Sequence, residues 1–372
     1  MEANPRMEAS DDVCVLLTWG DGSYGALGHG ERLSETVPRV VLALVPTELR
    51  GVSCGSATTF ALTADGAFSF GAAVGGVLGQ GAVRGDTSCV CTPQRVTGLR
   101  GGLTSLACGD RHALAAGEGG ELYAWGDGGD GRLWDCPGEA PEPAISLAVD
   151  AGVRAAAASA QADSSVAAVA CGSGRLWMFG DNGDGQLGLG DGGARRISGP
   201  QRVRTVACGG FFTAAVVAGG GMVTFGANEC GQLGHGGREA ERAPRLVRAL
   251  EGTPIAQVAC GACHLVALSE TGALHVCGRN GDGELGTGDL VGANAELPRR
   301  LPLFGDPGVC TVAVACGSFH TAAVVRLSRR RLGGLVGERA AAAVEERIAR
   351  RGRGVGVRNK GGGRGGCEGC LV

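Results

Sequence analysis

Six copies of a short motif, built from two glycines and a leucine, constrain what this chain can fold into. In each copy a glycine is followed by a second glycine five residues later and by a leucine seven residues later. The first glycines of the six copies are Gly20, Gly71, Gly126, Gly180, Gly226 and Gly278. Their spacing of about 50 residues indicates a chain assembled from repeated supersecondary units.

A second motif, a Cys-Gly pair followed by an apolar stretch, runs in phase with the first. It opens five units, at Cys54, Cys108, Cys208, Cys260 and Cys316. In the fourth unit, residues 155–170 occupy this place without a Cys-Gly pair. The apolar stretch leads through a glycine turn into a short strand that ends at the first motif, which is the pattern of a β-hairpin. A proline then marks a further strand, so each unit supplies about four short strands.

These units resemble the repeats of the regulator of chromosome condensation (RCC1-like) repeat family. The resemblance rests on the Cys-Gly, His-Thr, aromatic-Gly and Gly-Gln-Leu-Gly elements and covers residues 13–327. It implies an all-β fold, a β-propeller of RCC1-type repeats. Six blades are recognisable in the sequence, and a seventh is left open because the family usually has seven.

The two ends of the repeat region each hold half of a unit. Residues 13–20 form a strand without its hairpin partner, and residues 312–327 have the opposite lack. We therefore expect the N- and C-terminal strands to pair and close the ring, which protects sheet edges. This gives a propeller over 13–328, a disordered N-terminus over 1–12 and a basic Arg/Gly-rich low-complexity tail over 329–372.

The glycines and the leucine of the first motif have a predicted structural role. Each loop is expected to pack against its neighbour with no room for a Cβ atom, which requires glycine. The leucine is expected to insert the loop into the interface between two blades. Within the tail, the sequence GERAAAAVEERIARRG predicts a short helix.

Composition narrows the cellular setting. No apolar run reaches the ~18 residues of a membrane helix, and the polar, acidic residues 1–12 do not resemble a secretory signal. The 16 cysteines are therefore expected to be reduced thiols. We predict a cytoplasmic protein, with nuclear residence left open. Of the 34 basic residues Lys360 is the one lysine, which suggests a coding bias toward arginine.

Histidines and cysteines offer weak candidates for a metal site. His112, His264 and His320 each follow a Cys-Gly cysteine by four residues, one in each of three units. Because this spacing places them in different blades, we interpret them as structural. The cysteine pairs at 89–91 and 260–263 lack the second pair that a closed zinc site needs.

Catalytic motifs are not recognisable. The Asp- and Gly-rich segments 181–191 and 126–133 lack the alternating ligands of a calcium loop, and the sequence contains no phosphate-binding loop, nucleophile elbow or zinc-protease helix. We predict no cofactor, no metal and no covalent catalysis. Whether the protein is an enzyme is left open, because guanine-nucleotide exchange needs no covalent step.

Acidic residues gather in the loops that follow the first glycine of five units. Equivalent loops emerge on one side of a propeller, so these residues predict an acidic rim that attracts a basic partner. They are Asp21, Asp127, Asp130, Asp181, Asp184, Glu229, Asp282 and Glu284. The alternative is that aspartate simply suits tight turns.

The family resemblance implies three functions. The first is a protein–protein interaction propeller that regulates a small GTPase, and the second is guanine-nucleotide exchange on a Ran-like GTPase. The third is a chromatin- or RNA-associated scaffold that acts through the basic tail. Contact with nucleic acid is the less favoured of these, and no membrane partner is expected.

Exchange activity would call for an inserted β-wedge in one blade. Residues 135–152 and 81–94 are the two longest irregular inserts, but neither has the pattern of a hairpin, so no exchange residues are assigned. Light-sensing relatives use clustered tryptophans. Here the four stand singly, at Trp19, Trp125, Trp134 and Trp177, so photoreception is not expected.

Overall fold

In the computed structural model of this chain, the described residues are 12–81, 88–99, 102–127, 142–144, 153–158, 166–171, 176–180, 182–188, 196–197, 202–289 and 292–355. For the strands from 142 to 180 and for 196–197, the backbone is described without side chains. All other statements below concern these residues.

The described strands pair into four-stranded antiparallel sheets. Blade 1 contains β3 (Leu49–Cys54), β4 (Thr58–Thr63), β5 (Gly66–Ala72) and β6 (Cys89–Arg95). Blade 2 contains β7 (Leu103–Cys108), β8 (His112–Gly117), β9 (Leu122–Gly126) and β10 (Glu142–Ala144). Blade 3 contains β15 (Val203–Cys208), β16 (Phe212–Val217), β17 (Met222–Gly226) and β18 (Glu241–Leu246). Blade 4 contains β19 (Ile255–Cys260), β20 (His264–Ser269), β21 (Leu274–Gly278) and β22 (Ala295–Arg300).

The closing blade joins the two ends of the repeat region. It contains β1 (Asp12–Gly20), β2 (Glu35–Val40), β23 (Val309–Cys316) and β24 (His320–Ser328). Strand β1 pairs with β24 along its whole length, from Asp12 opposite Ser328 to Gly20 opposite His320. The expected closure by the terminal strands is therefore present, and it rests on backbone hydrogen bonds between distant parts of the chain.

The sequence predicts six blades, one more than the five blades that the structure establishes. The fourth sequence unit supplies β11 (Val153–Ala158), β12 (Val166–Cys171), β13 (Leu176–Gly180) and β14 (Arg196–Ile197). These strands pair into a further four-stranded sheet, but their side chains lie outside the described residues. This is the unit that lacks the Cys-Gly pair. The structure thus establishes five blades of an all-β propeller, each with at least three strands described with their side chains.

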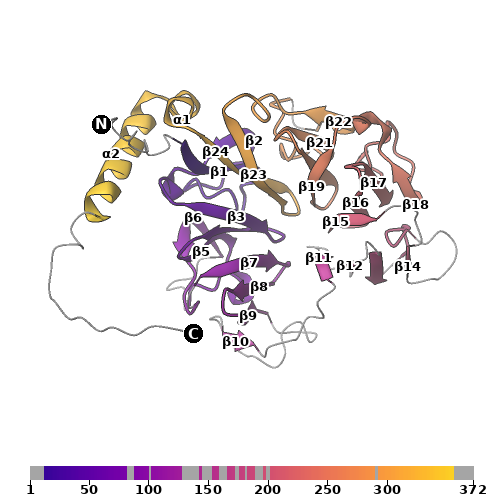
Figure 1. Cartoon of the computed structure of the whole chain (residues 1–372), viewed down its shortest axis with the longest axis horizontal. Helices are drawn as coiled ribbons and strands as arrows, with labels where there is room; N and C mark the ends of the chain where they lie inside the picture. The colour runs from indigo at the N-terminus through magenta and orange to yellow at the C-terminus, as the bar shows by residue number, and fades with distance from the viewer. Residues whose placement is uncertain are drawn as a thin grey trace, which may run out of the picture.

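The innermost strands follow one another in an arc around a common centre (Figure 1). Contacts join β7 to β3, β3 to β23, β23 to β19, β19 to β15 and β15 to β11. Each outermost strand carries a proline, at Pro38, Pro93, Pro244 and Pro298 in the four blades where the strand is described with side chains. Proline suits an edge strand because it has no N–H to donate to a further neighbour.

The apolar core lies between blades. The second strand of a blade is covered on both sides, and β4, β16 and β20 are buried along their whole length. Since successive side chains of a strand point to opposite faces, adjacent residues serve different interfaces. Phe60 packs against Trp125 of blade 2, with ring centroids 6.1 Å apart, whereas Ala61 lies in a cluster with Leu16 of the closing blade.

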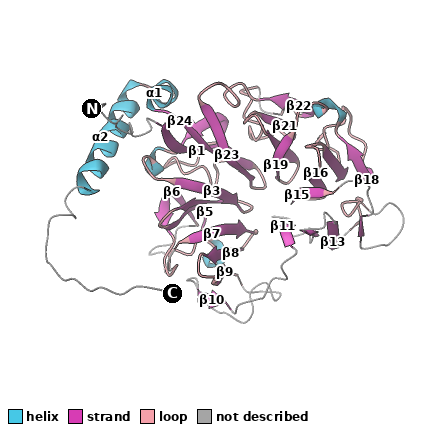
Figure 2. Ribbon diagram, viewed as in Figure 1, coloured by secondary structure: helices cyan, strands magenta, loops and turns pink. Residues whose placement is uncertain are grey.

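Two helices follow the closing blade directly, at its outer side (Figure 2). Helix α1 (Arg329–Val336) is capped by Ser328, whose Oγ accepts a hydrogen bond from Arg331 N at 3.4 Å, and α2 spans Glu338–Val355. Leu332 and Val344 are buried in the same apolar cluster as the closing blade. The helix predicted from the tail sequence is present within α2. None of the helices in the described ranges has the length and apolar character to cross a membrane.

Three short 3₁₀ segments complete the described elements, at Leu42–Leu44, Val74–Gly76 and Arg248–Leu250.

Candidate docking face at one end of the propeller

The loops that carry the Cys-Gly pairs meet around the centre of the arc. Gly210 N donates to Ala262 O at 3.1 Å, Ala262 N donates to Ser318 O at 3.0 Å, and Ser318 N donates to Ser56 O at 2.9 Å. These bonds connect blades 3 and 4, the closing blade and blade 1 in turn. We call this set of loops the glycine collar, because each contains the glycine of a Cys-Gly pair.

Glycine is needed in the collar because neighbouring backbones come very close. A Cβ atom on Gly317 would lie 2.6 Å from the carbonyl oxygen of Gly55, and one on Gly261 would lie 2.6 Å from the carbonyl oxygen of Gly317. Both distances are too short for real atoms, so a side chain here would force the blades apart.

The histidines that follow the collar link adjacent blades. His320 Nε2 lies 2.9 Å from Thr59 Oγ1, and the Thr59 hydroxyl donates to Ala26 O at 2.7 Å. Because that hydroxyl has one proton, it must accept from His320, which places a proton on Nε2. Burial lowers the pKa of His320 to about 4 and that of His264 to about 3. Both rings are therefore neutral at pH 7, in agreement with the structural interpretation of these residues.

Burial also keeps the collar cysteines protonated at neutral pH. Cys54, Cys208, Cys260 and Cys316 are buried, and burial raises the pKa of Cys54 and of Cys208 to about 12. A thiol that stays protonated is a poor nucleophile and a poor metal ligand. Within the described ranges, no three His, Cys, Asp or Glu side chains gather into a metal site.

The loops of the repeated glycine–leucine motif reach onto the following blade, as the sequence predicts. A Cβ atom on Gly231 would lie 2.7 Å from Glu296 Cα, and one on Gly283 would lie 2.8 Å from Thr36 Cα. The motif leucines are buried wherever they are described, at Leu27, Leu78, Leu187, Leu233 and Leu285.

Backbone hydrogen bonds hold these loops beside the collar. In five blades, the residue after the first glycine donates its N–H to a collar carbonyl: Asp21 to Phe319, Ala72 to Ala57, Asp127 to Arg111, Ala227 to Phe211 and Arg279 to Cys263. The side chains of both loop sets therefore lie at the same end of the propeller. We call this end the axial loop face.

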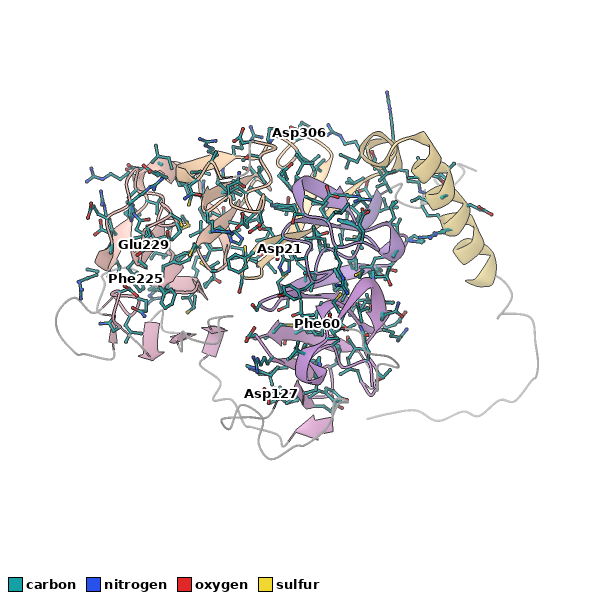
Figure 3. The ribbon with its side chains drawn as sticks, turned by 180° about the vertical axis from the view of Figure 1, so that it is seen from behind. Asp21, Phe60, Asp127, Phe225, Glu229 and Asp306 are labelled. Carbon is teal, nitrogen blue, oxygen red and sulfur yellow. The ribbon has the colours of Figure 1, made fainter. Side chains whose placement is uncertain are left out.

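The predicted acidic residues have different environments. Asp184 and Glu229 are exposed, and Asp21, Asp127 and Asp282 are partly buried. Figure 3 shows Asp21, Asp127 and Glu229 on loops of three different blades. Asp130 and Asp181 lie outside the described residues.

Turn geometry accounts for one of these acids. Asp21 Oδ1 accepts hydrogen bonds from Ser23 N at 2.9 Å and from Ser23 Oγ at 2.6 Å. This is the local pattern by which aspartate stabilises a turn, and it is the alternative that the sequence had left open for the acidic rim.

Glu284 is not available to a partner, because its side chain is fully buried. Its Oε2 accepts a hydrogen bond from Asp282 N at 2.8 Å, and its Oε1 pairs with Arg279. In two other copies a glutamine makes the same backbone contact, with Gln232 Oε1 accepting from Cys230 N at 3.0 Å. Burial raises the pKa of Glu284, and Arg279 and the Asp282 N–H oppose this. Glu284 is therefore a loop-stabilising residue.

Basic and aromatic side chains, which the sequence did not predict here, share this face. The Arg279 guanidinium lies 4.8 Å from the Phe319 ring centroid and bonds Asp282 Oδ2 at 2.9 Å. Arg111 pairs with Asp127 at 3.7 Å. Phe319 is 38 % exposed, Tyr24 53 % and Val74 52 %. The face is thus a mixture of charged, aromatic and apolar groups, and the acids are partly neutralised.

The repeat geometry agrees with a comparison of the whole chain, in which a family model described as the RCC1-like domain matches residues 15–331. The chain belongs to the RCC1-like domain family. It is 32 % identical over 321 residues to the ultraviolet-B receptor UVR8 of Arabidopsis thaliana, covering 83 % of this chain and 70 % of that protein. It is 30 % identical over 371 residues to the mitochondrial RCC1 domain-containing protein RUG3 of the same organism, covering 86 % and 77 %.

Solved structures support the fold. Prp20p of Saccharomyces cerevisiae, described with its binding properties to Gsp1p and histones, superposes with a TM-score of 0.60 at 17 % identity and covers 91 % of this chain and 95 % of its own. Human WBSCR16 gives a TM-score of 0.57 at 21 % identity, covering 84 % and 98 %.

Two tryptophans of this RCC1-like propeller have structural roles. Trp125 Nε1 donates to Val77 O and Trp19 Nε1 donates to Glu284 O, each at 2.8 Å, so each indole ties its blade to the loop of the preceding one. They lie in different blades. Trp134 and the side chain of Trp177 are outside the described residues.

Neither insert considered as an exchange wedge forms a described hairpin of its own. Residues 89–94 of the 81–94 insert belong to β6, the outermost strand of blade 1. Of the 135–152 insert, β10 is described, and it pairs with β9. In the described parts, both inserts contribute to ordinary blades of the RCC1-like fold.

Proposed function

We propose that this protein is a cytoplasmic interaction propeller that binds a protein partner on the axial loop face and thereby regulates a small GTPase. The observation that carries the proposal is the exposed Phe319 ring held beside the Arg279 guanidinium. Aromatic and arginine side chains surrounded by polar groups are typical of the energetic centre of protein interfaces. The fold shared with Prp20p adds support by analogy alone.

Hydrogen bonds and ion pairs hold the central side chains and loops of this face in place. Arg279 is held by Asp282 and by the buried Glu284, and the Phe319 carbonyl accepts the Asp21 N–H at 2.8 Å. A partner would therefore meet side chains that lose little freedom on binding, which favours affinity.

Guanine-nucleotide exchange is the alternative activity. It requires only that the partner GTPase binds this propeller and its nucleotide with negative coupling, so no covalent chemistry is needed. The mixed charge of the axial loop face suits contact with a polar partner surface.

The scaffold function through the basic tail has less support. Arg331 pairs with Asp306 at 3.4 Å, Arg329 pairs with Glu345 at 3.7 Å, and Arg347 Nη1 donates to Leu42 O at 2.8 Å. These three arginines thus have intramolecular partners that compete with phosphates.

The test is the release of a fluorescent GDP analogue from a panel of small GTPases, with and without the protein, together with binding of each GTPase by calorimetry. We expect binding to at least one member, weakened by Glu229→Lys and by Phe319→Ala. Asp65→Lys is the matched control, because Asp65 is exposed in the β4–β5 turn at the opposite end of blade 1. Accelerated release would establish the exchange alternative. Equal loss of binding for the control and the face variants would overturn the assignment of the face.

A further inference from the structure

Two cysteines lie in contact on the outermost strand of blade 1. Cys89 Sγ and Cys91 Sγ are 3.8 Å apart. They are two residues apart on β6, so both side chains project from the same face of the strand. Cys89 is buried and Cys91 is partly exposed.

This pair differs from the collar cysteines. The thiols of Cys54, Cys208, Cys260 and Cys316 belong to four different blades, and each is buried. Cys91, by contrast, lies on an edge strand with part of its side chain in solvent. Burial raises the pKa of Cys89, and the charge of Arg32 opposes that shift.

The strand can bring the two sulfurs within bonding distance. Two residues of an extended strand span about 6.6 Å, which lies inside the ~4.4–6.8 Å range of Cα separations that disulfides bridge. Strand β6 is also irregular here, because its register against β5 shifts between Val90 and Gln94. A bulged backbone can contract without breaking a regular ladder.

The closing blade rests on this pair. Gly30 N donates to Cys91 O at 2.8 Å, and a Cβ atom on Gly25 would lie 2.8 Å from Cys91 Sγ. A change in the position of Cys91 would therefore be felt by the loop that carries Asp21 and Tyr24.

We propose that Cys89 and Cys91 form a modification site, a dithiol that a hydroperoxide oxidises reversibly to an intrastrand disulfide. The Cys91 sulfur attacks the peroxide, the O–O bond breaks, and the products are Cys91 sulfenic acid and, with hydrogen peroxide, one water. The Cys89 sulfur then attacks the Cys91 sulfur, the S–O bond breaks, and a second water leaves with the Cys89 proton. Two thiols are oxidised and one peroxide is reduced. This inference does not depend on the identity of any partner.

The sequence supplies a direct assay. Cleavage after Arg84 and Arg95 releases peptide 85–95, which contains Cys89 and Cys91 and no other cysteine. The full chain is treated with hydrogen peroxide, alkylated, digested and analysed by mass spectrometry. We expect this peptide to lose both alkylation sites and about 2 Da, and to regain both sites after reduction with dithiothreitol. We also expect faster hydrogen exchange at the Gly30 amide in the oxidised protein.

Two variants separate this result from general oxidation. In Cys91→Ser, the peptide carrying Cys89 should remain alkylatable under the same conditions. Cys230→Ser is the control, because Cys230 and Cys263 form the competing pair of neighbouring thiols. Burial, and after it the Cys230 thiol, raises the pKa of Cys263 to about 11. The proposal is overturned if peptide 85–95 keeps both free thiols while other cysteines oxidise, or if Cys91 stops at irreversible sulfinic acid.

Discussion

Two equivalent interfaces of this propeller use the same loop and different chemistry. Between blades 3 and 4, the loop offers the neutral Gln232, whose carbonyl accepts a weak bond from Cys277 Sγ at 3.4 Å. Between blade 4 and the closing blade, the equivalent residue is the acidic Glu284, whose carbonyl accepts from Trp19 Nε1 at 2.8 Å and from Thr321 Oγ1 at 2.9 Å.

The second interface has more buried polar contacts between side chains and loops. His264 occupies the place held by Phe212 in blade 3, and its Nε2 lies 3.0 Å from Thr321 Oγ1. The acidic loop is balanced by Arg279, which stands where blade 3 has Ala227. The repeat thus preserves the backbone contacts between blades, while the charges of the side chains are balanced separately at each interface.

Truncation of the side chain that precedes the first motif glycine, Trp19 or Cys277, should give the largest difference in stability between the two interfaces. Trp19→Ala deletes a buried indole and its hydrogen bond, so we expect a loss of about 4 kcal/mol in the free energy of unfolding, whereas Cys277→Ala should cost about 1 kcal/mol. Urea denaturation followed by circular dichroism measures both. Similar losses for the two variants would show that the interfaces are energetically alike.

The ion pair predicts the next largest effect. Arg279→Ala leaves the buried Glu284 carboxylate without its cation, and we expect a loss of about 2–3 kcal/mol in the free energy of unfolding. In the double variant with Glu284→Gln, which recreates the neutral loop of blade 3, stability should return to within about 1 kcal/mol of the original. A double variant no more stable than Arg279→Ala alone would refute the compensation.

Acid should weaken the histidine-bearing interface selectively. The pKa of His264 is about 6.5 in the unfolded chain and is lowered to about 3 in the fold, mainly by burial. Its stabilising contribution is therefore complete above pH 6.5 and declines as pH falls from there toward 3, by about 2 kcal/mol at pH 5.

The measurement is urea unfolding at pH 7.5 and pH 5, for the natural protein and for His264→Phe, which copies the residue found in blade 3. The variant should lose less stability between the two pH values. An unchanged difference would assign the acid sensitivity to other groups, such as His320.

An exposed ion pair gives the smallest expected effect. Arg238 Nε donates to Glu296 Oε1 at 2.8 Å across the interface of blades 3 and 4, and both side chains are exposed. Arg238→Ala should change the free energy of unfolding by about 0.5 kcal/mol or less, and the difference should vanish in high salt. A loss comparable to that of Arg279→Ala would mean that burial does not distinguish the two pairs.

Local features of the site were accessible to prediction, and relations between blades were not. The turn role of Asp21 and the burial of Leu233 follow from motif and spacing. The burial of Glu284 was missed because it was grouped with the acidic loop residues, although its alignment with Gln186 and Gln232 was a usable signal. The approach of Arg279 to Phe319 joins residues 40 positions apart in different blades, and no local pattern encodes it.

The repeated unit, the pairing of the terminal strands and the need for glycine at Gly283 could be predicted from the sequence. These properties depend on the period of apolar residues and on backbone conformations that are set within a few residues. Only the fold shows which acids are buried, that Gly317 lies against a backbone carbonyl of another blade, and that Cys89 and Cys91 touch beneath a loop of the closing blade. Those outcomes depend on which blade lies beside which, because burial and charge balance arise from neighbours that are distant in the chain.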